Sequence, residues 1–271
     1  MGFQLARRGF LAVYAVIIAA PLTIVLYTSF KTSQELFADP FGLPQNPTLD
    51  NFSEVLVGQD LARNVVNSVV VTGVSVPLTV LLASLAAFAI ARIPGWRSAA
   101  VFAAFLIGMA VPAQVNMIPQ YVLFRQLGLT NSLTGLVLIN VVVTLPLGIF
   151  ILTGFMKTLP RELFEAASVD GVPPWRTYTS IVMPLSLPSV SALAIFLLVI
   201  HWNELLYPLL FITDPAKATL PKALLDFKGE YLTNYPLLFT GVLVASVPMV
   251  LAYVFLQRFF VAGMTAGAVK G

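Results

Sequence analysis

Few side chains in this sequence have the types and spacing that catalysis needs. The 271 residues include no Cys and a single His, His201, so disulfides, thiolate ligands and metal sites with several imidazoles are excluded. No Gly-Lys dipeptide occurs, so the phosphate-binding loop G-x-x-x-x-G-K-[ST] of ATP-hydrolysing proteins is absent. We therefore expect no catalytic residue, no metal site and no cofactor in this chain, and no ATP hydrolysis by it.

The most informative segment for local structure is 157–184, which reads KTLPRELFEAASVDGVPPWRTYTSIVMP and combines charged residues with glycine and prolines. Pro160 and Glu162 are typical of the first turn of a helix, where the fixed proline φ and a negative charge are favourable. Gly171 is typical of a helix end, because it adopts left-handed conformations without strain. A second short helix is expected over 175–183. The pattern predicts a helix, a glycine turn and another helix.

This predicted hairpin has two interpretations. Ala166 and Ala167 would leave a shallow place that another protein can approach, and Glu165 beside them offers one charge to that protein. Alternatively, an amphipathic hairpin would rest on lipid headgroups. Residue chemistry alone favours neither interpretation.

The composition indicates which kind of secondary structure positions these residues. The sequence is 58% hydrophobic and 10% charged, whereas soluble domains carry about 25% charged residues, so a water-soluble globule is excluded. The net charge of +3 is read as basic loops at an anionic membrane surface, not as nucleic-acid binding. The uncharged runs are long enough for helices and too long for barrel strands. We predict an all-α membrane protein with six transmembrane helices, at about 9–30, 67–91, 98–122, 133–156, 185–207 and 236–258.

The distribution of Lys and Arg predicts the orientation of these helices. With the N-terminus inside, nine of the fifteen basic residues are cytoplasmic and six are outside. Both termini are then cytoplasmic, as are the loop 157–184 and the C-terminal tail 259–271. The segments 31–63 and 213–236 lie outside, as solvated loops by default.

Four polar residues are candidates for lining a path through the membrane: Gln114, Asn116, Asn203 and Glu204. The alternative for the amides is hydrogen bonding between helices. The alternative for Glu204 is a capping role, since it lies near the outer end of the fifth predicted helix. His201 is interpreted as a packing histidine with satisfied hydrogen bonds.

Part of the loop carries a long, gapped motif with fixed spacing. Glu165-Ala166-Ala167, then Asp170-Gly171, then Pro184-Leu185 closely resembles the EAA loop of ABC-importer membrane permeases. In that family the loop forms the coupling helix, which docks in a cleft of the ATPase subunit. The resemblance implies the ABC type I importer permease architecture, with one transmembrane domain over 1–271 and 157–184 as its coupling loop. It also implies that the residues that couple to the ATPase are Glu165, Ala166, Ala167, Asp170 and Gly171.

Three further segments resemble carbohydrate permeases of the maltose-transporter type. They are Pro112-Ala113-Gln114-Val115, Trp202-Asn203-Glu204 and the tail that runs from Gln257-Arg258 to Lys270-Gly271. The tail is similar to that of the second permease subunit, whose C-terminus reaches the ATPase dimer. This implies tail contacts to the ATPase by Gln257, Arg258, Gly267 and Lys270.

The resemblance also implies the partners. They are a second permease subunit in a heterodimer, two copies of a cytoplasmic ATPase that hold the ATP and Mg, an extracytoplasmic solute-binding protein, a sugar and the lipid bilayer of a bacterial-type cytoplasmic membrane. We therefore expect a multi-pass sugar permease subunit without enzymatic activity. The alternatives are an ABC permease for glycerol phosphate, a polyol, an amino acid or a polyamine, and a self-sufficient secondary transporter.

Overall fold

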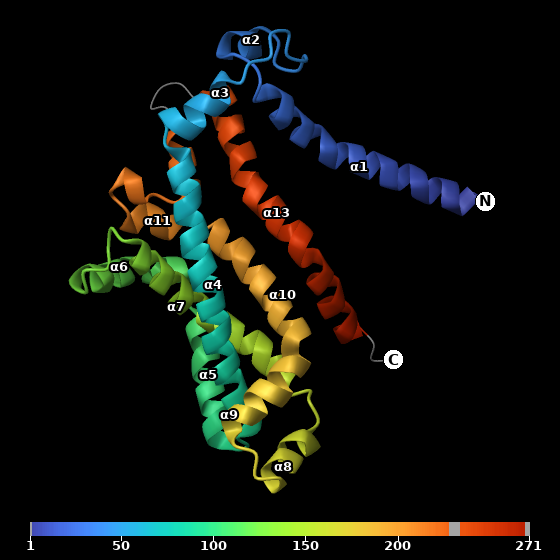
Figure 1. The fold of residues 1–271 in the computed structure, drawn as a ribbon, viewed down its shortest axis with the longest axis vertical. Coiled ribbons are helices and arrows are strands. Elements are labelled where there is room, and N and C mark those ends of the chain that lie inside the picture. The colour runs from blue at the N-terminus through green and yellow to red at the C-terminus, as the bar shows by residue number, and fades with distance from the viewer. Residues whose placement is uncertain (1, 228–233, 269–271) are drawn as a thin grey trace. The chain divides into compact units, whose positions relative to one another are not determined.

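The computed structural model describes residues 2–227 and 234–268, and every regular element within them is helical (Figure 1). The predicted all-α class is therefore confirmed. Contacts divide the chain into two compact units. One unit consists of residues 1–65 and 220–250, and the other of residues 66–219 and 251–271.

Five of the described helices are long and apolar enough to cross a membrane. These segments are Ala6–Thr28, Leu61–Arg92, Leu133–Met156, Pro174–Trp202 and Tyr235–Phe255. A sixth span is counted when the bent pair Trp96–Ala110 and Ala113–Gln126 is taken as one. The expected number of six thus depends on this pair.

The predicted third span, 98–122, is a broken pair and not one continuous helix. Helix α5 (Trp96–Ala110) ends at Val111, whose φ of −83° and ψ of 121° are extended. The turn η2 (Ala113–Asn116) follows, and α6 (Met117–Gln126) continues at 85° to α5. The reason is Pro112, which disfavours the helical conformation of the residue before it.

The first unit contains a folded loop between α1 (Gly2–Thr28) and α4 (Leu61–Arg92). Lys31 is fully buried there, and its Nζ donates a hydrogen bond of 2.8 Å to the carbonyl of Asp39. The Nδ2 of Asn51 donates to the carbonyls of Ser29 and Lys31, at 2.9 and 2.8 Å. This part of the expected outer loop is therefore structured by buried polar contacts. The unit's other elements are α2 (Ser33–Ala38), α3 (Asp50–Ser53), η1 (Glu54–Gly58), α12 (Leu220–Asp226) and the first part of α13 (Tyr235–Ala268).

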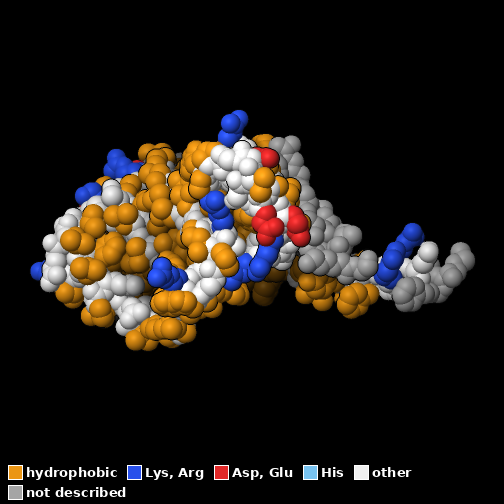
Figure 2. Space-filling view, turned by 90° about the horizontal axis from the view of Figure 1, so that it is seen from below, with side chains coloured by type: hydrophobic (Ala, Val, Ile, Leu, Met, Phe, Trp, Pro, Cys, Tyr) orange, Lys and Arg blue, Asp and Glu red, His pale blue; other side chains and the backbone are white. Residues whose placement is uncertain are grey.

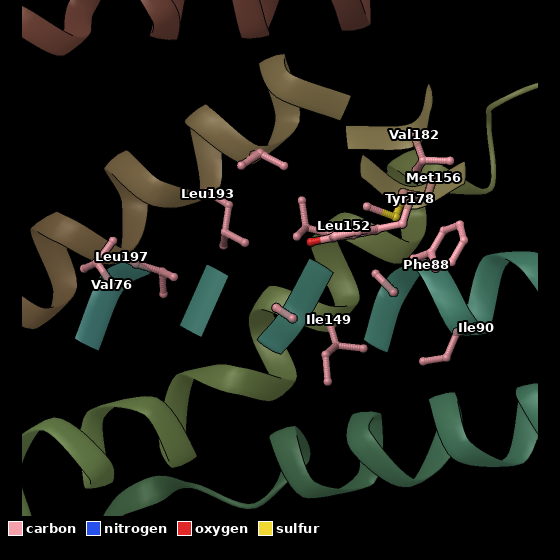
Figure 3. Packing of buried hydrophobic residues seen from close by; sticks show 13 residues of the cluster. Val76, Phe88, Ile90, Ile149, Leu152, Met156, Tyr178, Val182, Leu193 and Leu197 are labelled. Carbon is pink, nitrogen blue, oxygen red and sulfur yellow. The ribbon is translucent and has the colours of Figure 1, made fainter. Parts of the chain in front are cut away.

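The second unit is built around α4, α7 (Leu133–Met156) and α10 (Met183–Trp202). Figure 3 shows their buried side chains meeting, with Ile149 and Leu152 of α7 between residues of the other helices. A Cβ added at Gly148 would lie 2.8 Å from the Cβ of Ala83. Glycine at this position therefore lets α7 approach α4 closely, as small residues do between membrane helices.

A second apolar cluster joins α6, α7 and α11 (Leu206–Phe211). Phe211 is its centre, with ring centroids 5.2 Å from Phe124 and 5.8 Å from Tyr207. Asn131, at a φ of 52°, accepts hydrogen bonds from the backbone of Thr213 and Asp214 through its Oδ1. Because of these bonds, the segment after α11, which includes the turn η4 (Pro215–Lys217), is fixed to the segment before α7.

Two predicted helix ends differ in the structure. Helix α10 stops at Trp202 and a separate α11 begins at Leu206, so the fifth predicted helix, 185–207, is interrupted near its end. Helix α13 continues to Ala268, through most of the predicted tail 259–271. Gln257, Arg258 and Gly267 belong to its backbone, and Lys270 lies outside the described residues.

Candidate functional site

The predicted hairpin is present in the second unit, and its first arm is α8 (Arg161–Val169). The helix starts directly after Pro160, with Glu162 in its first turn, as the sequence indicates. Phe164 is half-buried against the α4–α7–α10 core, and Ala167 is only 4% exposed. Glu165 and Ala166, the next two residues around the helix, are exposed. One side of α8 thus packs on the bundle while the other remains accessible.

The expectation that both alanines are accessible is wrong for Ala167. Residues three apart share one face of a helix, so Ala167 follows Phe164 toward the core. Ala166, with Glu165, stays on the accessible side. A partner could contact Ala166 directly, whereas Ala167 acts by letting α8 lie close to the bundle.

Gly171 ends the helix as predicted. Its φ is 68°, in the left-handed region, and its N–H donates to the carbonyl of Ser168 at 3.2 Å. The next N–H, that of Val172, donates to the carbonyl of Ala167 at 2.9 Å. This pair of bonds satisfies two carbonyls that the helix end would leave without partners. The turn between the arms therefore has one defined geometry, with Asp170 exposed beside it.

The second arm is not a separate short helix. Helix α9 (Pro174–Thr177) passes through a π-helical turn, η3 (Tyr178–Val182), directly into α10. Pro184 supplies no N–H to the helical ladder, and its ring crowds the carbonyl four residues earlier, that of Ser180, which lies within η3. The predicted break before Pro184 is thus a local widening of one continuous helix over Pro174–Trp202.

A chain of aromatic rings connects the two arms with α4. Tyr178 lies 5.5 Å from Trp175 and 5.4 Å from Phe88 of α4, measured between ring centroids. Phe88 lies 6.4 Å from Phe164 of α8. The buried Tyr178 hydroxyl also forms a 2.8 Å hydrogen bond with the hydroxyl of Ser84. The hairpin is therefore attached to two long helices, by packing to α4 and by continuous backbone to α10.

Farther along the same helices, a buried polar junction joins α4, α7 and α10. His201 is 4% exposed; its Nδ1 is 2.7 Å from the Ser75 hydroxyl, and its Nε2 is 3.0 Å from the Thr144 hydroxyl. The Thr144 hydroxyl also lies 2.6 Å from the carbonyl of Asn140. The interpretation of His201 as a satisfied packing histidine is confirmed, and both its nitrogens bridge helices.

The candidate path residues lie at two connected places. Gln114 is exposed and Asn116 half-buried on η2, just before α6, while Asn203 and Glu204 follow the end of α10. The carboxylate of Glu204 accepts from the N–H groups of Leu206 (2.8 Å) and of the next residue (3.1 Å), so it caps α11.

The two places meet where α6 contacts α11. The Tyr207 hydroxyl of α11 donates to the Gln120 side chain of α6 at 2.7 Å. Asn203 bonds within its own helix, to the carbonyl of Val199 at 2.8 Å. Of the two alternatives for Glu204, the structure shows the capping role, because its carboxylate accepts the two N–H groups at the start of α11.

Several structurally important residues were not identified from the sequence. Tyr178, Phe88 and Phe164 are far apart in the chain, and only the fold brings their rings together. A weak signal existed for Phe164, because it precedes the small Ala167 by one helical turn.

Comparison with known proteins agrees with this architecture. Residues 75–266 match the family described as the inner membrane component of binding-protein-dependent transport systems. A putative ABC transporter permease protein of Caldicellulosiruptor sp. is 38% identical over 97% of this chain and 95% of its own. The melibiose/raffinose/stachyose import permease protein MelC of Bacillus subtilis is 33% identical, over 93% and 91%.

A solved structure shares the fold. A bacterial ABC transporter involved in import of the acidic polysaccharide alginate matches with a TM-score of 0.83 at 18% identity. The match covers 95% of this chain and 96% of that one. With the family match over most of the chain and the apolar spans, these likenesses identify the protein: it is a multi-pass membrane protein of the family of inner membrane components of binding-protein-dependent transport systems.

Proposed function

We propose that this permease subunit imports a sugar and forms half of the translocation path, beside a second permease subunit. Family membership makes the chain a transport component and not an enzyme. Support for the sugar comes from the relative named for melibiose, raffinose and stachyose, which aligns over most of both chains. The sequence resemblance to maltose-type permeases supports the same substrate class.

We further propose that the hairpin is the surface that receives the ATPase. The end of the bundle with α8 would be cytoplasmic, with both termini on the same side, as the Lys and Arg distribution predicts. Two ATPase subunits would hold the ATP and Mg, and the accessible Glu165, Ala166, Asp170 and Gly171 would face one of them. An extracytoplasmic solute-binding protein would dock at the opposite end.

The observation that carries this proposal is the attachment of the hairpin to α4 and α10. When ATP closes the ATPase dimer, a displacement of α8 is passed through Phe164 and Phe88 to α4. The same displacement reaches α10 through the continuous backbone of α9 and η3. The His201 junction, which bonds α4, α7 and α10, makes these helices move together. The path opens toward the loaded binding protein, and hydrolysis resets it.

The other predicted contacts belong to the same proposal. Gln257, Arg258, Gly267 and Lys270 would contact the ATPase dimer, which the resemblance of the tail supports. Gln114, Asn116, Asn203 and Glu204 would lie along the outer part of the sugar path. The contact between α6 and α11 supports this placement, because it brings the two segments to one place.

The coupling role is tested by removing one ring from the aromatic chain. Phe164→Ala should raise the number of ATP molecules hydrolysed per sugar imported, because α8 then moves without carrying α4. The measurement is parallel uptake and hydrolysis by the complete complex in proteoliposomes. Phe150→Ala is the matched control, since it removes a ring pair of similar spacing, 6.5 Å to Phe102, that includes no residue of α8 or α9. Equal stoichiometry in Phe164→Ala and wild type would refute the coupling route.

The substrate class is tested separately by competition. Uptake of labelled melibiose or maltose should be inhibited by related sugars and not by glycerol phosphate, an amino acid or a polyamine. Inhibition by one of the latter alone would replace the sugar and leave the coupling proposal intact.

A further inference from the structure

A cavity of about 820 Å³ lies beside α8, at one end of the second unit. Its walls come from the last turn of α4, the connection to α5, the first turn of α5, the end of α7, and α8. Two of these helices, α4 and α7, are apolar spans that end at this cavity, at Arg92 and Met156. The cavity is therefore at the level where hydrocarbon gives way to headgroups and water. This holds whichever side of the membrane the end faces.

The cavity wall is basic. Arg92, Lys157 and Arg161 line it together with one carboxylate, that of Glu165. In the described part of the chain, the ion pairs found are two others, Arg63 with Asp60 and Lys217 with Asp214. The guanidinium groups of Arg92 and Arg161 thus have no carboxylate partner among the described residues. Three basic side chains against one carboxylate leave the cavity wall with an excess of positive charge, which favours an anionic ligand.

The remainder of the wall is apolar. Ile90, Ile93 and Phe164 line the cavity beside the basic residues, and Ile93 is 56% exposed. Next to it Trp96 is 76% exposed, with the Arg97 guanidinium 5.8 Å from its ring centroid. Exposed Trp with neighbouring basic residues is typical of the membrane interface. Figure 2 shows the same mixture on this end, with basic side chains set among apolar ones.

We propose that this cavity binds an anionic phospholipid, with the headgroup phosphate between Arg92, Lys157 and Arg161 and the upper acyl chain against Ile90 and Ile93. A free phosphate ion would contact only the basic residues of the wall, whereas a phospholipid contacts the basic residues with its headgroup and the apolar residues with its acyl chain. The rim is fixed, because the Ser98 hydroxyl donates to the carbonyl of Ile90 at 2.7 Å. The bound lipid touches α4 and α7 on one side and α8 on the other. It therefore holds α8 at the membrane surface.

The test uses the complete complex in nanodiscs of phosphatidylcholine with or without phosphatidylglycerol. The cavity variant is Arg92→Gln with Arg161→Gln. The matched control is Arg97→Gln with Arg176→Gln, which removes two exposed basic residues that do not line the cavity. Phosphatidylglycerol retained on the complex is counted by native mass spectrometry after release into neutral detergent. Each Lys or Arg near an anionic lipid contributes about 1 kcal/mol, or about fivefold in binding, so we expect the retention of the cavity variant to be weaker by roughly twentyfold.

The control should lose clearly less than the cavity variant, because Arg97 and Arg176 do not line the cavity, and Arg92→Lys with Arg161→Lys should restore most of the retention. Equal losses in the cavity and control variants would reduce the effect to general surface charge and overturn the proposal. Displacement of the lipid by millimolar inorganic phosphate would identify a simple anion site and also overturn it. Nanodiscs of pure phosphatidylcholine contain no anionic lipid. If the cavity variant loses the ATPase in these nanodiscs, the two arginines bind an acidic side chain of the ATPase, and the lipid proposal is overturned.

Discussion

The glycine at the hairpin turn allows the coupling proposal to be tested with a single methyl group. At Gly171, with a φ of 68°, an added Cβ would meet no atom within 4 Å. The Gly171→Ala change therefore introduces no clash, and its whole cost is conformational. A non-glycine residue in the left-handed region costs about 1–2 kcal/mol. A cost of about 1 kcal/mol lowers the proportion of the capped turn roughly fivefold relative to uncapped conformers.

The chain contains a matched control for this substitution. Gly128, after α6, has the same φ of 68° and the same open surroundings. Ala at either position should lower thermal stability by a similar amount. If the turn geometry presents α8 to the ATPase, only Gly171→Ala should raise the ATPase concentration needed for half-maximal stimulated hydrolysis, by up to roughly fivefold.

The assay is a titration of purified ATPase into proteoliposomes that contain the permease pair and saturating binding protein. Gly171→Asn should recover much of the affinity, because Asn adopts the left-handed conformation more readily than Ala. The reasoning is refuted if Gly128→Ala raises the ATPase requirement as much as Gly171→Ala does. It is also refuted if Gly171→Ala lowers the melting temperature and leaves the requirement unchanged.

Three further substitutions test the packing that supports the hairpin. Gly148→Val should destabilise the complex by about 1–3 kcal/mol through overpacking against Ala83, seen as a lower melting temperature; an unchanged value would mean that α7 and α4 are not in close contact. His201→Leu should cost about 1–2 kcal/mol through two lost hydrogen bonds between helices and raise the ATP consumed per sugar; wild-type stoichiometry would exclude the junction from coupling. Glu204→Ala should cost about 1 kcal/mol by uncapping α11, with Glu204→Gln closer to wild type; equal stability of the two variants would contradict the capping role.

Local signals account for what could be predicted from the sequence. Long uncharged runs identify membrane spans because lipid cannot satisfy exposed backbone groups. The first arm of the hairpin and its end at Gly171 were predicted correctly, since proline, early acidic residues and glycine each act on the turn in which they occur.

Features that depend on distant contacts could not be predicted in this way. The burial of Ala167 depends on which face of α8 meets the bundle, and the link from Phe164 to Tyr178 requires Phe88, more than seventy residues earlier in the chain. The bend at Val111 had a local cause in Pro112, but other prolines, such as Pro77 and Pro146, lie inside helices that continue past them. Proline alone therefore does not decide where a membrane helix breaks.

Because the helix over Pro174–Trp202 is continuous, a tilt at one end displaces the other end. At 1.5 Å per residue, its 29 residues measure about 44 Å from the hairpin to the His201 end. A rigid tilt of about 5° set at one end moves the other by roughly 4 Å, close to the width of a water layer or a sugar hydroxyl contact. The wider turn at η3 is where some of that tilt can be absorbed. The stiffness of the five residues of η3 therefore determines how much of a displacement of the hairpin is transmitted to the end of the helix near His201.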